Sequence, residues 1–492
     1  MKVRFVTLGC KLNFAESSAL GKELLLRGHQ RASLHEVPDV CVVNTCSVTD
    51  TADHKDRQTI NQLHRKYPNA IIIVTGCYAQ LQPGQVSQIE GVDYVLGQNE
   101  KYSITQLVDE LCDSLEDGVP PTGRPTGYSL EAQKIRVANI REVDEFHGVH
   151  SADDRTRCFI KVQDGCNYFC SYCTIPYARG KSRNPHISEV VADAKKALEQ
   201  GAKELIITGV NIGDFGRSTG EKFIDLLKAL DNLEAEKTTQ SDLINDNIDN
   251  IALESTPSSA TQENENDLGE RREGDEAMRR EGDEAMRREA MRREAREYRV
   301  RISSCEPNLL TDEIIEFVAH SKHFAPHFHI PLQSGSNEVL KIMGRRYTRE
   351  LFAERVKHIK EVMPHAFIGV DCMVGVRGET EEYWEDYLAF IKGLDVSQLH
   401  VFTYSERANT RMLEMDLCVV PQAERKRRSK ILHVVSEEKT KAFYEKHAGR
   451  EAIVLWESKK EGDQMAGFTD NYIKVYGAYD KTKVNTFEAI II

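Results

Sequence analysis

Three cysteines stand close together in Cys166-Asn-Tyr-Phe-Cys170-Ser-Tyr-Cys173, directly after a predicted strand. Three thiolates on one loop can each bind one iron of a four-iron cubane, which leaves the fourth iron open to a small molecule. Zinc with a distant fourth ligand is the alternative, because zinc also uses thiolate loops. Zinc loops usually come as pairs of cysteines two residues apart. The spacing therefore favours an iron–sulfur cluster.

A second group of three cysteines lies at the ends of predicted strands in the N-terminal part of the chain. Cys10 follows VTLG, Cys46 follows VVNT and Cys77 follows IVTG. Parallel strands of an open α/β sheet end at one edge, the usual ligand crevice, so these thiols are expected to meet there. For each cysteine taken singly, a small buried hydrophobe is the alternative. Together they predict a second three-thiolate site.

The other cysteines are predicted to be structural, because they lie within predicted strands or helices or lack partners. They are Cys41, Cys112, Cys158, Cys305, Cys372 and Cys418. The N-terminal residues Cys10, Lys11 and Glu16 fall where a secretion signal would need an apolar core, so we expect a cytoplasmic protein. In a reducing compartment, cysteines are metal ligands, nucleophiles or core residues and only exceptionally disulfides.

The chain resembles the methylthiotransferases, a family of the radical S-adenosylmethionine (SAM) superfamily. The likeness rests on the cysteine loop and on the longer stretch QDGCNYFCSYCTIPYARGKSR around it, and it covers nearly all of the chain except one insertion. It implies two [4Fe–4S] clusters and SAM as cofactors. The loop cysteines would hold the cluster that binds SAM, whose reductive cleavage yields a 5′-deoxyadenosyl radical. The N-terminal three would hold an auxiliary cluster that carries or donates the inserted sulfur, and no catalytic residue beyond these ligands is expected.

Strand ends rich in glycine and serine are expected to line the SAM pocket, since they let a backbone approach a ligand closely. By resemblance, the cofactor-binding residues would be Thr208, Gly209, Asn211, Ser303, Ser304, Glu306, Gln333, Asp371 and Gly375. Taken singly, such residues after strands are ordinary turns. The sequence departs from the family at Val376-Arg377, where other members more often carry Phe-Pro.

Basic and aromatic side chains suggest contacts with RNA. Basic residues after the predicted active-face loops can bind phosphates, and aromatic residues of the terminal segment can stack on bases. The predicted RNA-binding residues are Arg179, Lys181, Arg183, Arg345, Arg346, Phe468 and Tyr472. Three histidines, His323, His327 and His329, have no acid nearby in the sequence, which predicts packing rather than metal binding.

The elements that must position these residues are those of an α/β protein. Apolar runs followed by helical patterns in the N-terminal part indicate an open parallel sheet covered on both faces. A second alternating series, from CFIKVQDG to QLHVFTYS, predicts a partial (β/α)6 barrel with its chemistry at the C-terminal strand ends. The terminal segment alternates apolar and polar residues, as in a small antiparallel β-barrel. It resembles the TRAM RNA-binding domain.

These patterns divide the 492-residue chain into four parts. They are a methylthiotransferase domain at 1–116, a linker at 117–154, a radical SAM barrel at 155–440 and a TRAM-like domain at 441–492. The barrel is interrupted at 234–297 by a polar tract and the repeat RREGDEAM, predicted to be mostly disordered. This insertion holds 19 acids and 10 bases, so much of the formal net charge of −13 is local. No stretch approaches the ~20 apolar residues of a membrane span.

Three substrates compete within the family: threonylcarbamoyladenosine in tRNA, isopentenyladenosine in tRNA, and an aspartate of a ribosomal protein. NTCSVTDTADHKDRQ, TGCYAQ and IPYARGKSR look most like the threonylcarbamoyladenosine branch. That likeness implies methylthio insertion at C2 of the adenosine beside the anticodon, with tRNA, an electron donor protein and a sulfur source as partners. A non-catalytic, metal-stabilised RNA-binding protein is the alternative of another class.

Overall fold

The computed structural model describes residues 1–33, 35–116, 134–151, 156–233 and 298–492. Met1–Asn232 and Tyr298–Ile492 belong to one compact unit. The predicted insertion at 234–297 and part of the predicted linker lie outside the described residues, so what the sequence predicts for them stays a prediction.

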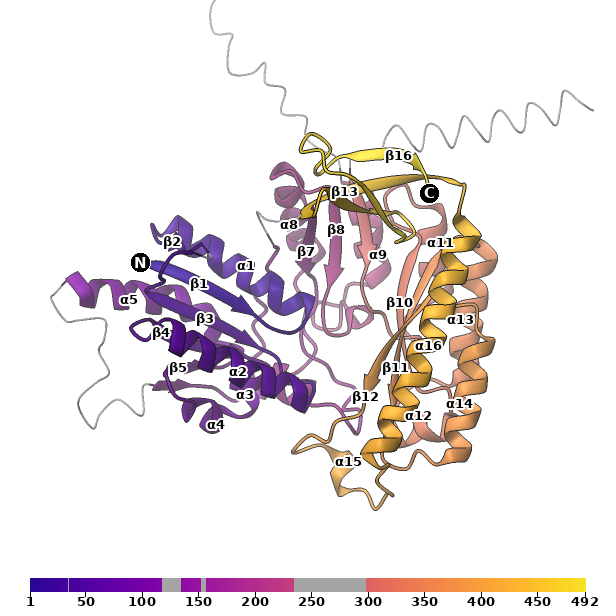
Figure 1. The fold of residues 1–492 in the computed structure, drawn as a ribbon, viewed down its shortest axis with the longest axis horizontal. Helices are drawn as coiled ribbons and strands as arrows, with labels where there is room; N and C mark the ends of the chain where they lie inside the picture. The colour runs from indigo at the N-terminus through magenta and orange to yellow at the C-terminus, as the bar shows by residue number, and fades with distance from the viewer. Residues whose placement is uncertain (34, 117–133, 152–155, 234–297) are drawn as a thin grey trace, which may run out of the picture. The chain divides into compact units, whose positions relative to one another are not determined.

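The N-terminal part forms the predicted parallel α/β sheet (Figure 1). Its strands, in the spatial order β2-β1-β3-β4-β5-β6, are β1 (Lys2–Thr7), β2 (Gln30–Arg31), β3 (Val40–Thr45), β4 (Ile71–Gly76), β5 (Val92–Leu96) and β6 (Ile135–Arg136). Its helices are α1 (Lys11–Leu26), α2 (Asp50–Lys66), α3 (Cys77–Leu81), α4 (Pro83–Ser87), η1 (Glu100–Ser103) and α5 (Ile104–Glu116). All strand pairs are parallel, so β1, β3 and β4 end at one edge.

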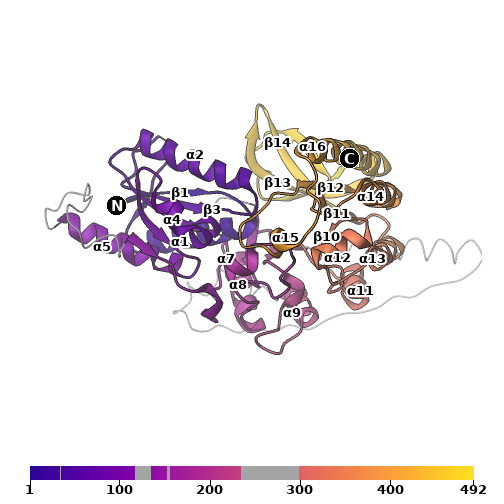
Figure 2. The same ribbon diagram turned by 90° about the horizontal axis from the view of Figure 1, so that it is seen from below.

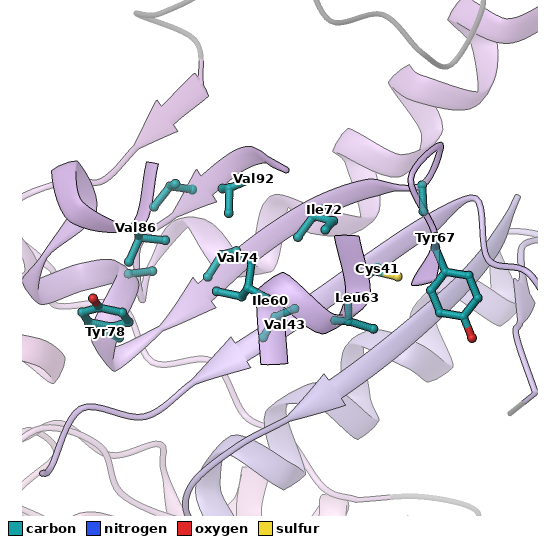
Figure 3. Close-up of a cluster of buried hydrophobic side chains, with 13 residues drawn as sticks. Cys41, Val43, Ile60, Leu63, Tyr67, Ile72, Val74, Tyr78, Val86 and Val92 are labelled. Carbon is teal, nitrogen blue, oxygen red and sulfur yellow. The ribbon is translucent and has the colours of Figure 1, made fainter. Parts of the chain in front are cut away.

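Two hydrophobic clusters cover the two faces of this sheet. Because side chains alternate along a strand, Val43 and Val74 face one side while Val42 and Ile73 face the other. Helix α2 packs on the first side, where Figure 3 shows Ile60 and its neighbours over β3 and β4. Helices α1 and α5 pack on the second side. Burial on both faces explains why these strands read as continuous apolar runs.

The central part forms an open barrel of six parallel strands (Figure 1). Strands β7 (Arg157–Lys161), β8 (Glu204–Thr208) and β9 (Arg299–Ile302) form one sheet, and β10 (His327–Gln333), β11 (Phe367–Val374) and β12 (Gln398–Thr403) form another. Parallel bridges Val300–Phe324 and Ser304–His329 connect the two sheets. The helices and 3-10 turns are η2 (Ile140–Glu142), α7 (Ile175–Arg179), α8 (Ile187–Glu199), η3 (Ile212–Asp214), α9 (Phe223–Asp231), α11 (Asp312–His320), α12 (Asn337–Met343), α13 (Arg349–Val362), α14 (Glu381–Gly393), α15 (Arg411–Glu414) and α16 (Gln422–His447).

Helix α1 packs against the open side of the barrel at β7. The ring of Phe14 lies edge-on to that of Phe159 at 6.0 Å. The N-terminal part also contacts the segment after β12, where Arg407 pairs with Asp50 at 2.7 Å and with Asp53 at 2.6 Å. The N-terminal part therefore contacts the outer strand β7 and the segment that follows the other outer strand, β12.

The C-terminal part is a four-stranded antiparallel sheet in the order β15-β14-β13-β16. Its strands are β13 (Glu451–Glu461), β14 (Gln464–Thr469), β15 (Lys474–Ala478) and β16 (Phe487–Ile491). The sheet lies beside α16 (Figure 2), and Phe443 of that helix shares a buried cluster with Phe367 and Ile473. No described helix is long and apolar enough to cross a membrane.

Candidate active site

The C-x3-C-x2-C loop connects β7 to α7 and is held by its own backbone. Cys166 N–H donates to Gly180 O at 3.0 Å, and Cys173 N–H donates to Cys170 O at 3.0 Å. Gly165, just before the loop, has φ +69°, and a Cβ there would clash with the Lys181 carbonyl. A glycine is therefore required at the entrance to the loop.

The three loop thiols share one electrostatic environment. Burial raises the pKa of Cys166 to about 11 and that of Cys173 to about 12. The charge of Cys170 contributes to both of these shifts. At Cys170 itself, burial also raises the pKa, and Arg345 acts to lower it. The Nη1 of Arg345 donates to the Cys170 Sγ at 3.0 Å. The loop therefore brings the three sulfur atoms close together, as the spacing predicts.

The N-terminal cysteines also converge, each from the end of a different strand. Cys10 precedes α1, Cys46 follows β3 and Cys77 begins α3. Burial, helped by the charges of Cys77 and Cys10, raises the pKa of Cys46 to about 12. Gly9 has φ +98°, and a Cβ there would lie 3.0 Å from the Cys46 sulfur. The edge of the sheet thus gathers these thiols, as the strand-end positions predict.

A buried arginine connects the two cysteine sites. Arg179 ends α7, and its Nη2 donates to Asn13 Oδ1 at 2.7 Å. The Asn13 amide donates in turn to the carbonyl of Thr45, the residue before Cys46, at 2.9 Å. The charges of Cys77 and Cys10 contribute to raising the pKa of Arg179. One side chain from the barrel therefore reaches the backbone that carries the N-terminal cysteines.

Charged partners surround this arginine. Arg179 Nη1 lies 3.0 Å from Glu16 and 3.1 Å from Asp164, while Glu16 also pairs with Lys101 at 2.5 Å and Lys161 at 3.4 Å. Burial alone would raise the pKa of Glu16, but Arg179 and the two lysines lower it overall. The network fastens α1 to β7 and its loop.

Arg179 and Arg183 are not placed to contact RNA, contrary to the sequence-based prediction. Arg179 is 2% exposed, and Arg183 donates to the Arg179 carbonyl at 2.7 Å and pairs with Asp164 at 3.3 Å. Both guanidinium groups are taken up by acceptors within the protein. The Lys181 side chain between them is 60% exposed and stays accessible.

Arg345 and Arg346, which were also predicted to bind RNA, differ from each other in how far their side chains are exposed. Arg345 is buried and pairs with Glu306 beside Cys170, so it belongs to the cysteine loop and not to an RNA surface. Arg346 is exposed and lies over the ring of Tyr168 at 4.1 Å.

The two aromatic residues predicted to stack on RNA bases pack against the barrel instead. Phe468 stacks on Tyr472 at 5.0 Å, and Arg157 lies over Phe468 at 4.7 Å. Tyr472 also contacts the ring of His327 at 4.8 Å. The exposed aromatic residue of this sheet is Tyr476, at 52%.

Apart from Asp371, which lies within β11, the predicted SAM residues lie at or just after the C-terminal ends of the barrel strands. Thr208, Asn211, Ser303 and Gly375 are buried, whereas Gly209, Ser304, Glu306, Gln333 and Asp371 are partly exposed. Gln333 has φ +64°, and its buried Oε1 has no hydrogen-bond partner among the described residues. A strained residue with an unsatisfied polar atom at a strand end fits a ligand contact. Glu306 contributes to raising the pKa of Cys166 and Cys170, so its charge lies near the loop.

His329 has the acid partner that the sequence pattern missed. Its Nε2 lies 2.7 Å from Asp371 Oδ1 on the neighbouring strand. His323 and His327 stack on Tyr298 and Phe367, as predicted for packing histidines.

The described residues contain no group of three or more His, Cys, Asp or Glu side chains spaced for a single metal ion. A zinc ion needs all its ligands within about 2.0–2.3 Å of one centre. The three thiolates of a cubane bind different irons and lie farther apart. Both triplets therefore stay predicted cluster ligands on the strength of the cysteine pattern in the sequence.

Comparisons with known proteins agree with this geometry. The sequence matches the family described as "Uncharacterized protein family UPF0004" over residues 2–97 and the "Radical SAM superfamily" over residues 160–268 and 273–391. It is 33% identical to the threonylcarbamoyladenosine tRNA methylthiotransferase MtaB of Bacillus subtilis, covering 96% of this chain and 89% of that protein. The chain belongs to the radical SAM methylthiotransferase family.

Other methylthiotransferases are similar over the same length. MtaB of Aquifex aeolicus is 31% identical, covering 96% of both chains. The tRNA-2-methylthio-N(6)-dimethylallyladenosine synthase of Pelotomaculum thermopropionicum is 27% identical, covering 95% of this chain and 88% of that protein. As a radical SAM methylthiotransferase, the chain uses SAM and [4Fe–4S] clusters.

The cysteine triplets of this methylthiotransferase fit such clusters in their chemistry. Each site offers only sulfur donors, and burial keeps most of these thiols protonated until a metal binds. A coordinated thiol loses its proton to the metal's charge. The supporting residues Asn13, Glu16, Lys101 and Lys161 were missed by sequence analysis, because nothing in their spacing marks them.

Proposed function

We propose that this methylthiotransferase inserts a methylthio group at C2 of N6-threonylcarbamoyladenosine beside the anticodon of tRNA. The observation that carries the proposal is the pair of cysteine triplets joined by Arg179 within one compact unit. The choice of nucleoside is supported by the names of the relatives from Bacillus subtilis and Aquifex aeolicus, which match 96% of the chain.

In this proposal, the six cysteines of the two triplets are the cluster ligands. The loop triplet holds the SAM-binding cluster and the N-terminal triplet holds the auxiliary cluster. When bound, these groups supply the electron that cleaves SAM and the sulfur that is inserted. Arg345 offsets the negative charge of the Cys170 thiolate through its 3.0 Å contact.

The nine predicted cofactor-binding residues are proposed to surround SAM at the strand ends. Glu306 offers a carboxylate beside the loop triplet, which suits the positive charge of the SAM sulfonium. Burial raises its pKa, while the pairing with Arg345 favours the charged form. Gln333 brings an unsatisfied side-chain oxygen to the same end of the barrel.

For tRNA, the accessible groups are Lys181, Arg346 and the outer side of the C-terminal sheet. Lys474 lies over the exposed ring of Tyr476 at 4.6 Å, so the two present a cation and a stacking surface together. Base stacking on aromatic rings is a common mode of RNA recognition. We assign tRNA binding to the TRAM-like part at 441–492, cluster binding to 1–116 and SAM chemistry to 155–440, with 117–154 as the linker.

The reaction needs partners beyond tRNA. We propose that a separate electron donor protein and a sulfur source serve the two clusters, and that the enzyme works in the cytoplasm, where tRNA is found.

Nucleoside mass spectrometry of tRNA from cells that lack this chain tests the proposal. We expect loss of 2-methylthio-N6-threonylcarbamoyladenosine alone, with its unmethylthiolated precursor accumulating. Loss of the methylthio derivative of isopentenyladenosine would assign the other tRNA substrate. Unchanged tRNA nucleosides would contradict the proposal and point to the ribosomal-protein aspartate or to a non-catalytic RNA-binding role.

A further inference from the structure

The lumen of the barrel is polar and remains partly open to solvent. Along β11 and β12, outward-facing Val370, Cys372 and Leu399 are buried, whereas Asp371 and His400 on the opposite face are partly exposed. Side chains alternate between the two faces of a strand, so these positions line the lumen. A lumen filled by packed side chains would bury them instead.

Two histidines and one carboxylate meet at mid-height in this lumen. His329 Nε2 lies 2.7 Å from Asp371 Oδ1, and the rings of His329 and His400 are 4.9 Å apart. Asp371 and His400 are direct neighbours in the register of β11 and β12. Asp371 is hydrogen-bonded to His329 and acts on His400 through its charge alone.

Lys11, the first residue of helix α1, is exposed and lies near the same lumen. Its charge acts on His327 and His400, and it interacts electrostatically with Arg301 and Glu204 across the barrel. The packing of Phe14 against Phe159 fixes the start of α1 at this open side. None of the described carboxylates lies within 4 Å of the Lys11 ammonium group.

The lumen therefore carries an excess of positive charge. At its lower end, Glu204 is shared by two guanidinium groups, those of Arg299 at 2.5 Å and Arg301 at 3.1 Å. Lys11 adds a third cation without an acid of its own. Covering the exposed ammonium group of Lys11 with a ligand is costly unless the ligand brings an opposite charge. An anionic group from a ligand would complete this site.

We propose that Lys11, together with His400, binds the carboxylate of the threonylcarbamoyl group in the barrel lumen. This inference rests on the proposed function and adds the means by which the enzyme selects its nucleoside. The threonylcarbamoyl group carries one carboxylate and one hydroxyl, whereas an isopentenyl group carries neither. A site built for a carboxylate discriminates strongly against an analogue that lacks it, because its polar groups are then left unpaired.

The test compares two anticodon stem–loop RNAs, one with threonylcarbamoyladenosine and one with unmodified adenosine at the same position. Binding is measured by fluorescence anisotropy under anaerobic conditions, with the cluster-loaded wild type, Lys11→Gln, Lys11→Arg and His400→Gln. Lys22→Gln is the matched control, since Lys22 lies on the same helix but is held at the surface by Gln200 at 2.9 Å. Iron content and SAM cleavage without RNA are measured for every variant.

We expect Lys11→Gln to bind the modified RNA about tenfold to a hundredfold more weakly, the effect of losing one charge-assisted hydrogen bond. Its affinity for unmodified RNA, its iron content and its SAM cleavage should not change, and Lys11→Arg should recover most of the loss. An equal loss on both RNAs would overturn the proposal and assign Lys11 to phosphate binding. If Lys11→Gln loses iron, the test passes to His400→Gln. The proposal is overturned if His400→Gln prefers the modified RNA over the unmodified RNA as strongly as the wild type does.

The wild type separates this inference from the proposed function. Suppose that the wild type methylthiolates the modified RNA and that Lys11→Gln prefers this RNA over the unmodified one as strongly as the wild type does. In that case the lumen site alone is wrong. If the wild type binds both RNAs alike and forms no product, the proposed function fails and the lumen site fails with it.

Discussion

Arg179 holds a positive charge in a position that is 2% exposed, and two carboxylates and an amide keep it there. Taking such charges out of water is costly, and the mutual attraction of Arg179, Glu16 and Asp164 offsets the cost. Removal of the arginine would leave the two carboxylates with one cation fewer, balanced by Arg183 and by lysines. The same change would release Asn13 from the barrel.

Replacing Arg179 with methionine, which keeps much of the volume but not the charge, is expected to destabilise the fold by about 3–5 kcal/mol. Urea unfolding followed by far-ultraviolet circular dichroism measures this loss in the cluster-loaded protein. Arg217→Met is the matched control, because Arg217 is half exposed and its ion pair among the described residues is with Asp214. The control should change stability by less than about 0.5 kcal/mol. Equal effects of the two substitutions would show that the buried network does not hold the two sites together.

For single residues, the candidate cluster ligands are easier to predict from the sequence than the side chains that position them. The cysteines could be predicted because thiol spacing and strand-end position are visible in the sequence. The role of Arg179 could not, because a basic residue after a loop looks the same whether it meets a phosphate or a carboxylate 163 positions away. The pairing of His329 with Asp371 was hidden for the same reason, since the two residues are 42 positions apart.

Strand β10 and the C-terminal sheet meet at His327. The imidazole ring is buried between Phe367, at 5.4 Å, and Tyr472, at 4.8 Å. Burial lowers its pKa well below the usual value, and the nearby charges of Arg301 and Lys11 add to the effect. The folded protein therefore keeps this histidine neutral under conditions that protonate it in the unfolded chain.

The sign of the resulting pH dependence follows from proton counts. Below pH 6.5 the unfolded state binds a proton at His327 that the folded state does not bind, so stability falls as the pH drops. We expect wild type to lose about 1.4 kcal/mol more than His327→Phe for each pH unit below 6.5. Urea unfolding at pH 7.5 and 5.5 measures the difference. Parallel losses in both proteins would show that His327 is already protonated in the fold.

At the scale of elements, long apolar strands could be predicted and the short edge strands could not. β3, β4 and β8 are buried along their whole length, and their apolar runs mark them in the sequence. β2 and β6 have two residues each and no pattern of their own, so only pairing with β1 and β5 reveals them. The spatial order of the strands and the contact of α1 with β7 depend on tertiary packing.

For the whole molecule, the proposed function gives different tasks to two cysteine triplets that share one scaffold. The loop triplet lies at the top of the barrel, and the N-terminal triplet lies at the edge of the parallel sheet. The Arg179–Asn13 contact fixes the segments that carry them with respect to each other. Loss of a ligand at one site should therefore leave the other site assembled.

The most direct test of this account compares Cys170→Ala with Cys46→Ala, by iron content, 5′-deoxyadenosine formed from SAM under reduction, and methylthio product in tRNA. Each variant should retain about half the iron of the wild type, because one of two clusters is lost. Cys170→Ala should form neither 5′-deoxyadenosine nor product. Cys46→Ala should still form 5′-deoxyadenosine but transfer no methylthio group. If both variants lost SAM cleavage alike, or if Cys46→Ala still modified tRNA, two sites with separate tasks would be contradicted.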